Sequence, residues 1–117
     1  MNLTLFESMD ARQLKQYIRF LLWHYRVMDS FWYLNIAEQF DDATADRLNE
    51  MVWDRIAAMA AKDLVARFEI SQRGLQGFVA ALRYWPWCIL VDYRIAESRE
   101  DVVITVPSCP TQEARIR

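Results

Sequence analysis

The chain has 117 residues, of which 54% are hydrophobic and 14% aromatic, and its formal net charge is −2. This is the length of a single domain, residues 1–117, and the composition excludes an intrinsically disordered chain. The small net charge gives no electrostatic reason to expect nucleic acid as a partner.

Residues 10–40 carry the signature of an amphipathic helix. Asp10 with Gln13 three positions later is a capping-box pattern, and the eight residues before it indicate a short amphipathic lead-in or a frayed end. Apolar side chains then recur at helical spacing, at Leu14, Tyr17, Ile18, Leu21, Leu22, Tyr25 and Met28. The pattern leaves open whether this helix ends at Asp29-Ser30 or continues to Phe40.

Two further helices are predicted between residues 41 and 82. Asp41-Asp42 begins the first of them, since acidic side chains are favoured at a helix N-terminus. Its apolar residues form two adjacent stripes, Leu48, Val52, Ile56 and Met59 beside Trp53, Ala57, Ala60, Leu64 and Phe68. We expect other elements to cover this helix on two sides. Ser71 is the predicted N-cap of the last helix, where Gly74 and Gly77 predict close backbone packing or a loop.

Residues 87–106 are the only part of the chain with a strand pattern. Pro86 forces Trp85 out of helical geometry, and alternating residues from Trp87 to Ile95 favour a strand. A polar run then precedes a second apolar segment, residues 102–106, so we expect an antiparallel hairpin. The sequence therefore predicts an α+β fold in which about four N-terminal helices pack on a small antiparallel sheet.

The same features predict where the chain acts and with what. No apolar run is long enough to span a bilayer, and residues 1–30 lack a signal-peptide pattern, so no membrane partner is expected. Cys88 and Cys109 do not make a disulfide framework, which favours a reduced, cytoplasmic location. A two-stranded sheet has open edges that can pair, and with the many aromatic residues this predicts a homo-oligomer.

Cys109 is the principal candidate for chemistry. It lies between two prolines at a predicted strand-to-helix junction, where helix N–H groups can lower a thiol pKa and make a nucleophile. Glu113 and Arg115 follow it and could polarise a bound carboxylate or water. The alternatives are a small buried hydrophobe for Cys109 and a solvated helix start for the other two. One histidine and two cysteines fall short of a zinc site, so no metal is predicted, and the cofactor stays open.

Aromatic residues near the predicted hairpin are candidates for ligand binding. Trp85 and Trp87 flank a proline, and Tyr93 shares a strand face with Trp87, which would form a wall for a flat or apolar ligand. Core packing against the 41–68 helix is the alternative interpretation. His24, on the edge of the first helix stripe, is either a ligand or base, or a histidine at the edge of the core.

Three segments carry a resemblance to a known family: FWYLNIAEQF (31–40), LNEMVWDRIAAMAAKDL (48–64) and VPSCPTQEARIR (106–117). The chain resembles a family of uncharacterised cytosolic proteins from anaerobic bacteria and archaea, related to the L-2-amino-thiazoline-4-carboxylic acid hydrolase family. The resemblance implies helices before a strand-rich half, a chain that continues beyond residue 117 with further cysteines, and a carried-over Cys109. It thus predicts that the domain is truncated at its C-terminus.

Two classes of function follow from these patterns. The first is a small-molecule-binding or hydrolase-like domain, with a pocket between helices and sheet near Trp85, Trp87, Tyr93 and Cys109. The second is a non-catalytic helical module that oligomerises or docks a partner through its surplus aromatic residues. A pocket into which Cys109, Glu113 or Arg115 converges would favour the first class, and an exposed apolar patch would favour the second.

Overall fold

A computed structural model of the protein describes residues 1–110 and residue 113. Along the chain, the elements are α1 (Thr4–Glu7), α2 (Ala11–Gln39), α3 (Asp42–Arg67), α4 (Gly74–Leu82), α5 (Pro86–Leu90), β1 (Arg94–Glu97) and β2 (Val102–Thr105). The two strands form one antiparallel sheet, so the α+β prediction is confirmed. The described residues form five helices, whereas the sequence predicted about four.

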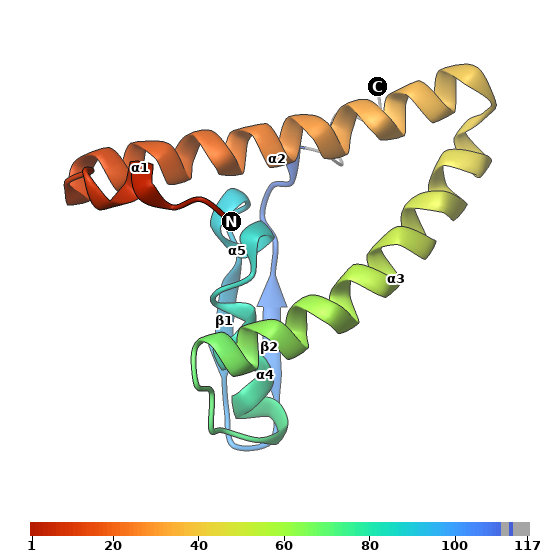
Figure 1. The fold of residues 1–117 in the computed structure, drawn as a ribbon. Helices are drawn as coiled ribbons and strands as arrows, with labels where there is room; N and C mark the ends of the chain where they lie inside the picture. Colours follow the sequence, from red (N-terminus) through yellow and green to blue (C-terminus); the bar gives the residue numbers. More distant parts are fainter. Residues whose placement is uncertain (111–112, 114–117) are drawn as a thin grey trace.

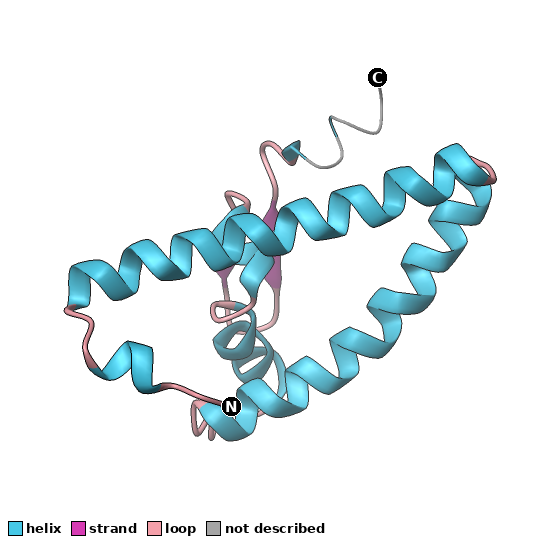
Figure 2. Ribbon diagram, turned by 45° about the horizontal axis from the view of Figure 1, so that its top comes forward, coloured by secondary structure: helices cyan, strands magenta, loops and turns pink. Residues whose placement is uncertain are grey.

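The long helices α2 and α3 form two arms of an open V (Figure 1). They meet at the sharp turn after Gln39 and diverge from there, and α4, α5 and the hairpin lie toward the open end. Figure 2 shows the same arrangement from another side. The short α5 contacts α2, and α4 contacts α3, so the small elements connect the two arms. Among the described residues, no helix is both long enough and apolar enough to cross a membrane.

Local capping sets the ends of the arms. The Asp10 carboxylate accepts a hydrogen bond from the Gln13 backbone N–H at 2.8 Å, and the Gln13 side chain accepts one from the Asp10 N–H at 2.9 Å. This confirms the capping box at the start of α2. The helix continues unbroken through Asp29 to Gln39, which settles the alternative that the sequence left open. Asp41 then caps α3 by accepting from the Thr44 N–H at 2.6 Å.

A hydrogen bond links the two arms close to the turn between them. The Tyr33 hydroxyl of α2 donates to the Asp46 carboxylate of α3 at 2.6 Å, and Ala45 beside it is fully buried. A small side chain at this position lets the two helix backbones approach closely. Further along, the arms separate, and their contact depends on the elements between them.

The predicted strand is wrong over residues 87–93, because residues 87–90 belong to α5 and the strand β1 begins only at Arg94. Trp85 has the extended backbone expected before a proline, but Pro86 then occupies the first helical position, where its fixed φ suits a helix. Residues 87–90 are all apolar, and such a short run does not distinguish a strand from a buried helical turn. The hairpin itself is confirmed further along, with Ile95 opposite Ile104 and Glu97 opposite Val102.

The start of α4 also differs from the prediction. Its N-cap is Arg73, without a side-chain cap, and not Ser71. Gly74 adopts a left-handed backbone with φ of 59°, which glycine reaches without a Cβ penalty and which sets the start of the helix. The predicted close packing is found at Gly77, where an added Cβ would run into the backbone carbonyl of Gln72.

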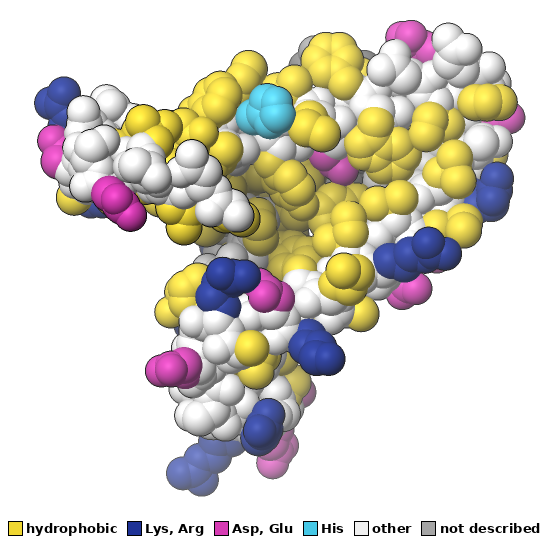
Figure 3. All heavy atoms as spheres, viewed as in Figure 1, with side chains coloured by type: hydrophobic (Ala, Val, Ile, Leu, Met, Phe, Trp, Pro, Cys, Tyr) yellow, Lys and Arg dark blue, Asp and Glu magenta, His cyan; other side chains and the backbone are white. Residues whose placement is uncertain are grey.

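The core is small. Among the described residues, the buried hydrophobic ones are Tyr33, Ala45, Ile70, Val79 and Val91. The expectation that α3 is covered on two sides is wrong, because Val52, Ile56 and Met59 are exposed, Met59 to 73%. No described element packs over this stripe. Figure 3 shows the consequence, with hydrophobic side chains spread over both arms and the hollow between them.

Candidate functional site

An aromatic cluster joins three helices about midway along the arms of the V. We define it as Tyr25 of α2, Trp53 of α3, and Trp85 and Trp87 at the start of α5. The Trp53 ring centre lies 5.8 Å from that of Trp87, 6.5 Å from that of Trp85 and 6.4 Å from that of Tyr25. Tyr25 and Trp87 are 5.7 Å apart. The two predicted tryptophans are therefore brought together around a third one.

The cluster serves the packing of the fold. Trp53 donates its indole N–H to the Asn49 side chain at 3.1 Å, which fixes the ring on α3. Aromatic pairs in tilted or edge-on geometry contribute about 0.5–1.5 kcal/mol each beyond the area they bury. Burial raises the pKa of the Tyr25 hydroxyl, a hydrogen bond from Trp87 acts in the opposite direction, and the nearby Asp29 charge raises it further. These half-buried rings contact one another and hold α5 against both arms.

The raised tyrosine pKa values predict a loss of stability at high pH. Tyr25 and Tyr93 both have pKa values raised by burial above the unfolded value near 10, so the folded state keeps their protons where the unfolded state has released them. This contribution is complete below about pH 10 and is lost as pH rises through the folded pKa values. We expect the urea midpoint to fall between pH 9 and 11, and to fall less steeply in Tyr25→Phe. An equal slope in this variant would contradict the assignment.

An apolar cavity of about 200 Å³ lies between α3 and α4, open to solvent on one side. Its lining is wholly apolar and consists of Ala57, Ala61, Leu64, Phe78, Ala81, Leu82 and Trp85. The small alanine side chains of α3 leave this volume unfilled, and the Phe78 and Trp85 rings form part of its wall. Trp85 thus lines this cavity and is also a member of the aromatic cluster.

Tyr93 lies at a second, more polar depression, which Arg83, Cys88 and Ile95 also line. Burial raises the Tyr93 pKa, and the thiols of Cys88 and Cys109 are near enough to raise it further. Burial also raises the pKa of Cys88, which disfavours the reactive thiolate. Arg83 at the rim is paired with Glu97 of β1 at 2.7 Å. This depression belongs to the junction of α5 with the sheet, away from the rings of Trp85 and Trp87 that Trp53 contacts.

Two of the three predicted catalytic residues, Cys109 and Glu113, lie within the described part of the chain. Cys109 is half-buried after β2, and its carbonyl accepts from the Glu113 backbone N–H at 2.9 Å. The Glu113 carboxylate, however, accepts from the Ser108 hydroxyl at 2.8 Å in an exposed position. Arg115 lies outside the described residues. Neither of the two depressions above is lined by Cys109 or Glu113.

His24 lies on α2 in another environment. It is exposed, and its ring stacks on Phe20 with centres 5.9 Å apart, whereas the aromatic cluster involves Tyr25, the next residue. Within the described part of the chain, no three His, Cys, Asp or Glu side chains gather as metal ligands. The described ring contact thus gives His24 an aromatic neighbour on its own helix, and its role as a ligand or base stays a prediction.

Comparisons with family models, curated proteins and solved structures find no match for this chain. The resemblance to the hydrolase-related family therefore stays a prediction. The expected truncation at the C-terminus also stays a prediction.

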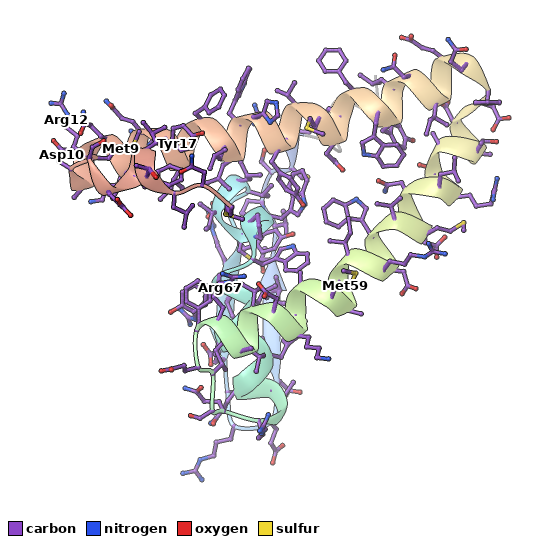
Figure 4. The ribbon with its side chains drawn as sticks, in the orientation of Figure 1. Met9, Asp10, Arg12, Tyr17, Met59 and Arg67 are labelled. Atoms are coloured by element: carbon purple, nitrogen blue, oxygen red, sulfur yellow. The ribbon has the colours of Figure 1, made fainter. Side chains whose placement is uncertain are left out.

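A feature that the sequence interpretation did not single out is an apolar stripe on α2. We call Phe20, Trp23, Val27, Phe31 and Leu34 the α2 stripe. All except the half-buried Val27 are exposed, Trp23 to 52%. Figures 3 and 4 show hydrophobic and aromatic side chains projecting from α2 on the side away from α3. The signal was present as a spacing of 3, 4, 4 and 3 residues, but in the sequence it is interleaved with the predicted stripe from Leu14 to Met28.

Proposed function

We propose that this chain is a self-associating helical module whose fold is completed by a second copy. The observation that carries the proposal is its accessible surface of 9562 Å². A compact monomer of 13.9 kDa exposes roughly 6,700 Å². The difference, about 2,900 Å², exceeds the roughly 800 Å² that each partner contributes to a standard interface.

The dimensions of the molecule support the same conclusion. The radius of gyration is 16.8 Å, whereas a compact domain of this length has about 13 Å. The apolar residues needed for a larger core are present, since Phe31, Met28 and Met59 are each at least 60% exposed. Burying such side chains contributes about 25 cal/mol per Å² of apolar surface. A second copy supplies the apolar surface that the open V lacks.

Hydrolase-like chemistry has weaker support. Catalysis by Cys109 needs a base or an oriented acid at the thiol, and the described contact of the Glu113 carboxylate is with Ser108. Binding of a small apolar compound is favoured by one observation, the cavity between α3 and α4. A single aromatic ring fits a volume of this order. We therefore keep small-molecule binding as a second candidate function, independent of Cys109.

The oligomeric state tests the proposal directly. We expect native mass spectrometry and sedimentation velocity to give twice the 13.9 kDa chain mass at all concentrations down to about 1 µM. The reason is that the accessible surface in excess of a compact monomer is larger than the area each partner contributes to a standard interface. A monomer throughout this range would contradict self-association.

The same spectra address the second candidate function. A retained compound would appear as a mass above that of the denatured chain, and titration with indole would then report occupancy of the α3–α4 cavity. Ala61→Leu fills this cavity and serves as the matched control, because Ala61 lines the cavity and lies on α3, apart from the exposed apolar residues of α2.

A further inference from the structure

We infer that the second copy docks on the α2 stripe, so that α2 of one protomer pairs with α2 of its partner. This inference rests on the proposed self-association and names the surface that carries it. Two other exposed apolar regions, the Val52–Met59 face of α3 and the edge of β2, are left for other contacts or for solvent.

The geometry of the α2 stripe is that of a helix–helix interface. At about 100° per residue, its five members fall within an arc of roughly 80°. Phe20 to Leu34 spans 14 residue steps, or about 21 Å of helix at 1.5 Å per residue. The successive steps of 3, 4, 4 and 3 residues give a mean period of 3.5, the repeat of a left-handed helix pair. The stripe is therefore straight and continuous enough for a second helix to pack along it.

The chemistry of the stripe selects a second copy as the partner. Between residues 20 and 34, the only charged residues are Arg26 and Asp29. By helical geometry they lie about 100° and 160° from the centre of the stripe. Two such stripes therefore meet without like-charge repulsion, whereas a charged partner finds no complementary group. A two-fold axis allows the same patch to be used by both protomers.

The residue types fit the centre of a protein interface. Phe20, Trp23 and Phe31 are aromatic, the class enriched in interface cores, and Phe20 contacts both the Trp23 ring at 6.1 Å and the His24 ring. This row of rings is already ordered on the helix before association. Little side-chain entropy is then lost when the partner covers it.

A matched pair of substitutions on α2 tests the inference. Phe31 is 60% exposed and Met28 is 61% exposed, but only Phe31 belongs to the stripe, and Met28 lies about 100° from its centre. We expect Phe31→Glu to raise the dimer dissociation constant at least 100-fold, because it buries a carboxylate from each protomer. Met28→Glu is expected to change it less than about threefold. Sedimentation equilibrium measures both, and circular dichroism checks that helix content is kept.

The outcomes distinguish failure of the α2 stripe from failure of self-association. A wild-type dimer that Phe31→Glu leaves intact, or that Met28→Glu weakens equally, overturns the α2 stripe while self-association stands. A monomeric wild type overturns both. If Phe31→Glu loses helix content, Leu34→Gln replaces it with a smaller change on the same stripe, and we expect at least a tenfold rise in the dissociation constant.

Discussion

Replacing Trp53 with alanine is expected to lower the free energy of unfolding by about 3 kcal/mol, the low end of the range for buried aromatic residues. Trp53 is half-buried, but its ring contacts Tyr25, Trp85 and Trp87, which come from the other arm and from α5. Its loss removes the side chain through which α3 contacts both. Nearer the turn the arms are linked by the hydrogen bond from Tyr33 to Asp46, so the change removes a connection midway along the V.

Urea denaturation at one fixed protein concentration measures this effect, since dimerisation makes apparent stability depend on concentration. Trp32→Ala is the matched control. Trp32 is half-buried like Trp53, but its described ring contact is with the neighbouring Tyr33 alone. A loss in Trp53→Ala no greater than in the control would show that the aromatic cluster does not hold the arms.

A double-mutant cycle isolates the contact that matters most. Trp53 and Trp87 lie 5.8 Å apart in edge-on geometry, and we expect a coupling energy of about 1 kcal/mol between Trp53→Ala and Trp87→Ala. The cycle separates the ring contact from the general cost of removing a large side chain.

The sequence predicted those parts of the fold that depend on neighbouring residues. Each of these features depends on residues no more than four positions apart. They are the Asp10 capping box, the start of α3 after Asp41 and the extended backbone before Pro86. The alternation from Trp87 to Ile95 predicts a strand that includes residues 87–90, but an apolar run this short does not distinguish a strand from a helical turn. Their helical form brings Trp87 to Tyr25, a contact between distant parts of the chain that no local pattern contains.

The candidate site also combines features that depend on neighbouring residues with contacts between distant parts of the chain. Trp85 and Trp87 could be identified as an aromatic pair from their positions around a proline, but their shared neighbour Trp53 comes from another helix. The backbone hydrogen bond from Glu113 to Cys109 fits the predicted helix start, and the Glu113 carboxylate accepts from Ser108, five residues earlier. Residue type indicated the chemistry available, and the tertiary contacts determined which groups meet.

The apolar faces of α2 and α3 illustrate a further limit. A wide apolar arc on α3 predicted burial on two sides, yet Val52 and Ile56 are exposed in the single chain. An apolar side chain has the same sequence pattern whether it packs within its own chain or against another one. The error therefore concerns whether this chain covers these residues. The proposed dimer covers the α2 stripe and leaves this face of α3 exposed.

Replacing Gly77 with alanine is expected to lower the free energy of unfolding by about 2 kcal/mol, although glycine in a helix interior normally costs about 1 kcal/mol relative to alanine. The sign reverses here because the added Cβ would run into the backbone carbonyl of Gln72. A backbone atom cannot move aside as a flexible side chain does. Relief requires a shift of the loop before α4, and this loop carries the buried Ile70.

Gly74→Ala is the control for this prediction, measured by the same urea titration. Gly74 has a left-handed backbone but open space around its Cα, so alanine there costs only the conformational penalty of about 1 kcal/mol. The larger loss at Gly77 would identify the close approach of α4 to the preceding loop as a constraint on the fold. Stability equal to or above wild type in Gly77→Ala would instead mean that the loop shifts freely, and that Ile70 does not anchor it.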